Sequence, residues 1–218
     1  MLIYLLLNRQ RSLVIGGGSV AERKVMQLLD SGSKITVASM NFTENLLKLG
    51  KMGKIKIIKI IVKAGFINSL SFKPRIIIVA LNDTKLNEKL SKESKLIGAL
   101  VCVVDNPKLS DFTMPAISRI GDFRIGISTN GKSPLMAGEI RKRIEKIITQ
   151  QDILQIELQN YSRIMCKKYI TSQNDRQKVL REIMKNKEIN KLLENDNLIE
   201  ANKLAKDIII NNKDNGID

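Results

Sequence analysis

The sequence predicts an α/β fold: a Rossmann-like parallel sheet with helices on both faces, followed by a helical C-terminal region. Three observations lead to this class. Strand-like and helix-like segments alternate up to residue 150, a glycine-rich turn joins the first strand to the first helix, and strand patterns then give way to helical periodicity. The 218 residues, 43% of them hydrophobic, suffice for one sizeable domain with an appendage or for two small domains.

The first strand–helix–strand unit spans residues 12–39. Apolar residues 13–15 predict a strand, glycines 16–18 a turn, and the apolar spacing over 20–29 a helix. Residues 34–39 alternate and are β-branched, which is typical of a second strand. The unit has the length of a βαβ unit, about 30 residues.

The later elements continue this alternation. They are a short helix over 41–53, a strand within 54–65, a buried strand over 75–81, an amphipathic helix over 84–98, and strands over 100–105 and 123–128. We expect these strands to join one open parallel sheet. A further helix is expected to have Ser133 as its N-cap and Pro134 in its first position. The opening segment 1–7 is expected to be a first strand or a packing arm.

Composition narrows the function classes. The net charge is +15, and residues 1–150 hold 25 Lys and Arg against 11 Asp and Glu. Such an excess indicates an anionic ligand, or only a lysine-rich composition. Aromatic residues make up 4% and Trp is absent, which argues against nucleic acid because base stacking needs aromatic rings. No apolar run reaches the ~18–20 residues that cross a membrane, and the two cysteines, Cys102 and Cys166, fit a reducing cytoplasm.

Asp105 is a candidate catalytic residue. The chain contains no histidine, so acid–base chemistry near neutral pH must use other side chains. Asp105 ends an apolar strand and is followed by Asn106 and Pro107, which force a turn. Ligands of open parallel sheets lie beyond the carboxyl ends of the strands. Asp105 is therefore either a catalytic group at that edge or a residue that caps the turn.

The pattern Gly16-x-Gly18-x-x-Ala21 indicates dinucleotide binding, because it follows a strand and opens a helix. Glycines let the backbone approach a pyrophosphate, whose charge the helix N-terminus favours. The acid that usually binds the ribose about 20 residues further on is missing, since the second strand ends in Ala38 and Ser39. The choice between NAD and NADP stays open from this spacing.

A second glycine motif, GISTNGKS over 126–133, matches the P-loop pattern of nucleoside triphosphatases. The surrounding pattern does not support that function, because only helical segments follow, whereas a P-loop normally opens a sheet that further strands complete. The role of the 128–133 loop is left open.

Three segments in order resemble the precorrin-2 dehydrogenase family, which is also the dehydrogenase/ferrochelatase module of siroheme synthases. They are LVIGGGSVAERKVMQLLDSGSKITV, VVDNPKLSDFTMPAI and IGISTNGKSPLMAGEIRKRIEKII, and the resemblance covers residues 1–150. It implies NAD-dependent oxidation of precorrin-2 to sirohydrochlorin in siroheme biosynthesis, and in some members Fe²⁺ insertion as well.

The resemblance also implies site residues. The catalytic acid falls at Asp105, and no residue is assigned to a metal. The expected NAD contacts are Gly16, Gly17, Gly18, Ser19, Val20, Met40, Asn41, Leu81, Asn82 and Asp83. The chain departs from the family's common Ser-Gly-Gly-Thr-Ser-Pro loop at residues 129–134.

The expected organisation is an NAD-binding domain over 1–112, a linking and dimerisation region over 113–150, and a helical domain over 151–218. A homodimer is expected because an apolar stripe lies on a helical segment that is too small to bury a large core alone. The stripe comprises Leu154, Leu158, Tyr161 and Met165. Two other functions stay open, a non-catalytic dinucleotide-sensing module and a P-loop hydrolase.

Overall fold

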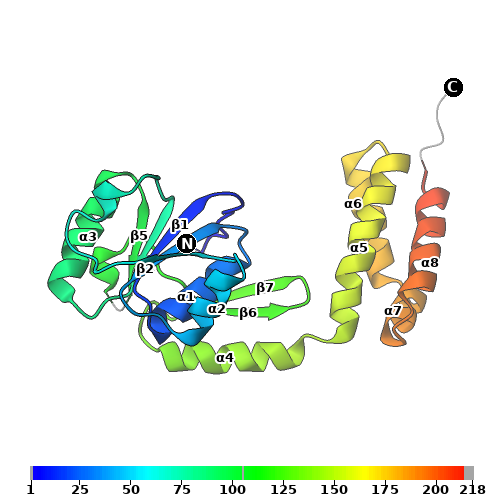
Figure 1. Ribbon diagram of the computed structural model, residues 1–218. Helices are drawn as coiled ribbons and strands as arrows, with labels where there is room; N and C mark the ends of the chain where they lie inside the picture. The colour runs from blue at the N-terminus through cyan, green and yellow to red at the C-terminus, as the bar shows by residue number, and fades with distance from the viewer. Residues whose placement is uncertain (1, 105, 214–218) are drawn as a thin grey trace. The chain divides into compact units, whose positions relative to one another are not determined.

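The computed structural model describes residues 2–104 and 106–213. Its contacts divide the chain into two compact units, Met1–Met114 and Pro115–Asp218. The first unit holds a parallel sheet in the order β3-β2-β1-β4-β5 (Figure 1), which confirms the predicted Rossmann-like fold. Its strands are β1 (Arg11–Ile15), β2 (Lys34–Ser39), β3 (Lys56–Lys59), β4 (Ile76–Val79) and β5 (Leu100–Val103).

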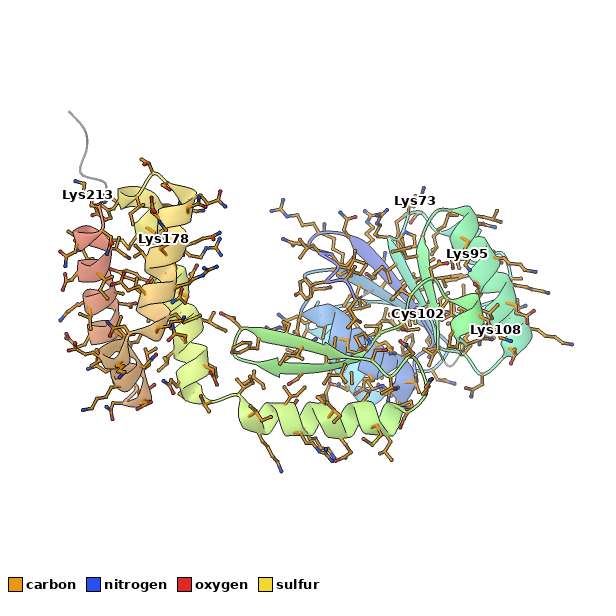
Figure 2. The ribbon with its side chains drawn as sticks, turned by 180° about the vertical axis from the view of Figure 1, so that it is seen from behind. Lys73, Lys95, Cys102, Lys108, Lys178 and Lys213 are labelled. Carbon is orange, nitrogen blue, oxygen red and sulfur yellow. The ribbon has the colours of Figure 1, made fainter. Side chains whose placement is uncertain are left out.

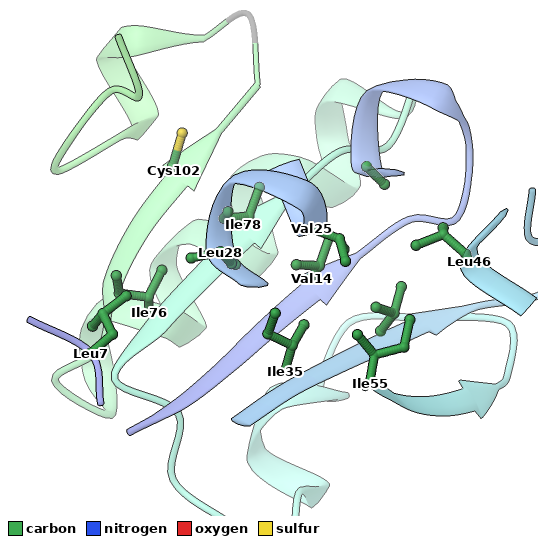
Figure 3. Packing of buried hydrophobic residues seen from close by; sticks show 12 residues of the cluster. Leu7, Val14, Val25, Leu28, Ile35, Leu46, Ile55, Ile76, Ile78 and Cys102 are labelled. Atoms are coloured by element: carbon green, nitrogen blue, oxygen red, sulfur yellow. The ribbon is translucent and has the colours of Figure 1, made fainter. Parts of the chain in front are cut away.

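Helices cover both faces of this sheet, as predicted. They are α1 (Ser19–Leu29), α2 (Glu44–Lys51) and α3 (Thr84–Leu96), with 3₁₀ turns η1 (Ile67–Ser69) and η2 (Pro107–Leu109). On one face, Val25 and Leu28 of α1 pack with Val14 of β1 in a buried cluster (Figure 3). On the other face, Leu90 of α3 packs with Leu13 in a second cluster. Burying these apolar residues is the main favourable contribution to folding.

The opening segment forms no strand in the described residues. Leu7 is buried and joins the α1-side cluster, whereas Leu2–Leu6 are exposed. Of the predicted packing arm over 1–7, the described structure therefore packs only Leu7 against the domain. Cys102 is 5% exposed in the same cluster and packs there as a small apolar residue, as predicted.

Glu93 connects α3 to the crossover between β3 and β4. Its side chain is buried, and its two carboxylate oxygens accept hydrogen bonds from the backbone N–H groups of Gly65 (2.6 Å) and Ile67 (3.3 Å). We expect Glu93→Ala to lower the free energy of unfolding by about 3 kcal/mol, because both N–H groups lose their charged acceptor. Urea denaturation measures this, with Glu88→Ala at an exposed position of α3 as control. Equal stability of the two variants contradicts the prediction.

The second unit begins with a hairpin that the sequence did not reveal. Strand β6 (Ala116–Ile120) pairs antiparallel with β7 (Phe123–Ile127), so the prediction that 123–128 joins the parallel sheet is wrong. Gly121, at φ +51°, and one further residue connect the strands, and so short a connection allows only an antiparallel pair. Helix α4 (Pro134–Ile147) follows and packs on the hairpin. Its N-cap is Ser133, as predicted.

Four helices complete the second unit: α5 (Gln150–Tyr169), α6 (Gln173–Lys185), α7 (Lys187–Glu194) and α8 (Leu198–Asn211). They bury their own core, which includes Ile183, Ile189 and Ala205. Leu154 and Leu158 are buried inside this core, and Met165 packs against it. The reasoning that this stripe needs a second chain is therefore wrong. Among the described helices, none combines the length and the apolar character that a membrane span requires.

Candidate functional site at the carboxyl edge of the sheet

The three segments predicted to bind a cofactor begin at one edge of the sheet. Ile15, the last residue of β1, lies opposite Ala38 of β2 and Val79 of β4. Because these strands are parallel, the chain leaves each of them at the same edge. The fold thus brings together the glycine turn, the segment 40–41 and the segment 81–83, and the switch between β1 and β4 is where open α/β sheets bind ligands.

Gly16 and Gly17 hold the turn against both neighbouring loops. The backbone of Gly16 has φ +120°, and a Cβ atom there would lie 2.4 Å from the carbonyl oxygen of Ala80. A Cβ atom at Gly17 would lie 2.0 Å from the carbonyl oxygen of Asn41. The carbonyl of Gly17 also accepts a hydrogen bond from the N–H of Thr43 at 2.9 Å. Both positions need glycine for the packing of the protein itself.

Gly18 is different, because a Cβ atom there would meet no heavy atom within 4 Å. Gly18 is the N-cap of α1 and supplies no side chain to bond the N–H groups of the first turn. Ser19 and Val20 follow on the exposed surface. Open space in front of uncapped N–H groups at a helix N-terminus fits the pyrophosphate of a dinucleotide.

The segment after β2 is fixed to α1 by polar contacts. The side chain of Asn45 donates to Glu22 Oε1 at 2.9 Å. Hydrogen bonds from the side chains of Thr43 and Asn45 lower the pKa of Glu22 below its ordinary value, so this carboxylate is charged at neutral pH. Met40 and Asn41 remain exposed beside the glycine turn. Asn41 offers a polar side chain where the usual ribose-binding acid is missing.

The segment after β4 leads into α3. Leu81 is half-buried, Asn82 is exposed, and Asp83 is the N-cap of α3, accepting from the N–H of Leu86 at 3.0 Å. Asn87 is 7% exposed and donates to the carbonyl of Leu81 at 2.9 Å. Its Oδ1 atom is buried without a hydrogen-bond partner in the described structure. Asn87 is thus a positioning residue for the 81–83 segment.

We expect Asn87→Asp to weaken NAD⁺ binding by about tenfold, because the carbonyl of Leu81 loses its donor and faces a carboxylate instead. Titration of the pure protein with NAD⁺ measures the change, and Asn160→Asp on the exposed surface of α5 is the control. An unchanged NAD⁺ affinity in a folded Asn87→Asp variant would show that the contact to Leu81 does not shape the site.

Asp105, the predicted catalytic residue, lies outside the described residues. The described chain on either side of it is anchored to the sheet. The N–H of Val104 donates to the carbonyl of Val79 at 2.9 Å. Further on, Ser110 Oγ accepts from the N–H of Val103 at 2.9 Å, and Asp111 Oδ2 accepts from the N–H of Val101 at 3.0 Å. The contacts of Ser110 and Asp111 satisfy N–H groups on the free edge of β5.

The P-loop-like segment is a capped connection between a hairpin and a helix. Strand β7 belongs to the two-stranded antiparallel sheet. The hydroxyl of Ser133 accepts from the N–H of Met136 at 3.2 Å as the helix cap. Asn130 and Gly131 form the turn, at φ +52° and +77°. A P-loop instead follows a strand of a parallel sheet and uses this hydroxyl for Mg²⁺, so the geometry argues against a nucleoside triphosphatase.

Comparisons with known families bear on both parts of the chain. The family model described as "Putative NAD(P)-binding" matches residues 3–116, and the model described as "Sirohaem biosynthesis protein central" matches residues 121–147. A solved structure of "SirC, precorrin-2 dehydrogenase" has a TM-score of 0.74 and 20% sequence identity, and the match covers 95% of this chain and 99% of that one.

Curated relatives fall into two groups by length. "Precorrin-2 dehydrogenase" of Methanosarcina barkeri is 28% identical over 186 residues, 84% of this chain and 82% of the relative. "Siroheme synthase 2" of Yersinia enterocolitica is 27% identical over 199 residues, 91% of this chain but 41% of the relative. "Siroheme synthase" of Methylococcus capsulatus is 36% identical over 146 residues, 67% of this chain and 30% of the relative. The chain thus spans less than half the length of these two siroheme synthases.

Proposed function

We propose that this chain, which belongs to the putative NAD(P)-binding family and carries the sirohaem-biosynthesis central segment, oxidises precorrin-2 to sirohydrochlorin with NAD⁺. The observation that carries the proposal is the uncapped helix N-terminus at Gly18, open to a pyrophosphate at the carboxyl edge of the sheet. The precorrin-2 dehydrogenase of M. barkeri, which the chain matches over 82% of its length, supports the choice of substrate.

The reaction removes a hydride and a proton from precorrin-2. Bound NAD⁺ supplies the hydride acceptor. In the proposed site, the N–H groups at Gly18, Ser19 and Val20 bind the pyrophosphate, and the segments 40–41 and 81–83 border the rest of the cofactor. Asp105 accepts the proton as general base, and the absence of histidine from the chain makes a carboxylate a reasonable group for this step.

The test is anaerobic incubation of the pure protein with precorrin-2 and NAD⁺, followed by NADH absorbance. Stoichiometric NADH formation supports the enzyme. NAD⁺ binding without NADH formation would instead indicate a dinucleotide-sensing module. Adding Fe²⁺ after the oxidation, and recording the spectrum of the iron-bound product, tests the second reaction that the siroheme synthase relatives suggest.

We further propose that the chain is a homodimer in which β6, β7 and α4 form the interface. Among the described residues, no further strand pairs with either edge of the hairpin, and an isolated two-stranded sheet is only marginally stable. Leu135, Met136 and Ile147 of α4 are exposed at 76%, 47% and 69%. The stripe on α5 is excluded from this role because Leu154 and Leu158 are buried in the helical core.

We expect light scattering at micromolar concentration to give the mass of two chains of 24.5 kDa. Leu135→Lys together with Ile147→Lys should shift the mass to one chain, because apolar contact area is replaced by charge. Ile199→Lys, at a residue of α8 that is 72% exposed, is the control and should leave the dimer intact. A wild-type protein with the mass of one chain would refute the dimer.

A further inference from the structure

A group of basic side chains lies at the opposite, amino-terminal end of the sheet. Arg11 and Lys34 open β1 and β2 and are register partners, and Lys56 opens β3 opposite Thr36. Side chains alternate along a strand, so residues two apart share a face. Leu13 and Ala38 belong to the α3-side cluster, which places all three cations on that same face of the sheet.

This part of the face is open because the crossover between β3 and β4 contains only the short turn η1. Phe66 and Ile67 from this crossover pack into the α3-side cluster. Over the strand beginnings a cavity of about 520 Å³ remains, bordered on one side by Ser71 and Phe72. Ligand sites typically range from roughly 300 to 1,000 Å³.

The cavity is lined by cations without acidic neighbours. Arg11, Lys34, Lys54 and Lys56 line it, and no Asp or Glu does among the described residues. None of the four forms an ion pair with another residue that the structure describes. The guanidinium of Arg11 lies 5.5 Å from the centre of the Phe72 ring, which restrains it at the cavity wall. Cations that line the same cavity repel one another, and a bound anion relieves that repulsion.

We propose that this cavity, which we call the basic groove, binds a compact polyanion that carries two or more phosphate or carboxylate groups. The groove is separate from the dinucleotide edge. Arg11 and Gly16 stand at opposite ends of β1, roughly 17 Å apart at about 3.3 Å per residue. In Figure 2, Lys73 precedes β4 near the groove end of the sheet, and Lys108 follows β5 near the other end. The proposal does not depend on the oxidation of precorrin-2.

The test is isothermal titration of the full chain with pyrophosphate and, separately, with citrate, at low ionic strength. Saturating NAD⁺ is present throughout, so that the helix N-terminus at Gly18 does not compete for the anion. We expect Lys34→Glu with Lys56→Glu to weaken polyanion binding by at least about tenfold, since two attractive charges become repulsive. NAD⁺ affinity, measured separately, should stay unchanged, which distinguishes failure of the groove from failure of the proposed reaction.

The matched control is Lys89→Glu with Lys92→Glu, the same change of charge on the exposed surface of α3. Equal weakening by both pairs would overturn the proposal, because the general positive charge would then explain binding. Absence of binding by the wild type at millimolar pyrophosphate and citrate would also overturn it. If the Glu variant fails to fold, Lys34→Gln with Lys56→Gln replaces it and should still weaken binding severalfold. Binding of citrate alone or pyrophosphate alone would identify the carboxylate or phosphate class.

Discussion

Asp105→Asn is expected to lower the rate of precorrin-2 oxidation by about 10²–10⁴-fold, the usual contribution of a positioned general base. The substitution keeps the shape of the side chain and removes its ability to accept a proton at neutral pH. Affinity for NAD⁺ should stay nearly unchanged, because the proposed pyrophosphate contacts are backbone N–H groups of the glycine turn. Single-turnover measurement of NADH formation at saturating NAD⁺ separates the chemical step from cofactor binding.

Two carboxylates of the segments beside the glycine turn already have structural roles. Asp83 caps α3, and Glu22 accepts hydrogen bonds that hold the loop after β2. This makes Asp105 the stronger candidate for proton transfer. Asp122→Asn, the same chemical change at an exposed residue of the second unit, is the control. Near-wild-type oxidation by a folded Asp105→Asn variant would show that Asp105 is not the general base and would favour its alternative role as a residue that caps the turn. Loss of Fe²⁺ insertion alone would mean that oxidation and insertion use different groups.

The sheet of the first unit was predictable because buried parallel strands are continuous apolar runs. Residues 75–81 and 100–105 are short apolar runs of this kind, and the glycine turn marks the first strand end. The pairing of β7 was not predictable, since local alternation identifies a strand but not its partner. Its partner β6 follows Pro115 and includes Ser118 and Arg119, so its own signal is weak.

The partners of the apolar stripe on α5 and of the candidate site were likewise not predictable from local sequence patterns. Periodicity correctly identified Leu154 and Leu158 as buried, but whether the chain's own helices or a second copy buries them depends on tertiary structure. The glycine pattern predicted a cofactor site at the turn after β1, whereas the contacts that hold this turn and its neighbouring loops come from distant residues. Thr43 and Asn87 are ordinary polar residues in the sequence, and only the fold shows that they hold Gly17 and Leu81.

Alanine substitutions at the three glycines of the turn should distinguish an effect on protein stability from an effect on NAD⁺ affinity. We expect Gly17→Ala to lower the free energy of unfolding by about 3 kcal/mol, because the added carbon overlaps backbone that can move only if the loop after β2 shifts. A Cβ atom would lie 2.0 Å from the carbonyl oxygen of Asn41. Gly16→Ala should be similarly damaging, since its φ of +120° is unfavourable for any residue with a Cβ atom.

Gly18→Ala should behave in the opposite way. The added carbon meets no protein atom within 4 Å, and the backbone of Gly18, at φ −82°, is one that alanine adopts readily. Stability should therefore fall by less than about 1 kcal/mol, the modest cost of replacing glycine by the poorer N-cap alanine. NAD⁺ affinity should nevertheless fall by tenfold or more, about 1.4 kcal/mol, because the second glycine of this pattern is where the backbone approaches the pyrophosphate. Thermal unfolding and NAD⁺ titration of the three variants provide the comparison. If Gly18→Ala bound NAD⁺ as tightly as the wild type, the phosphates would not lie at the N-terminus of α1, and the cofactor would have to approach the edge from the loops after β2 and β4.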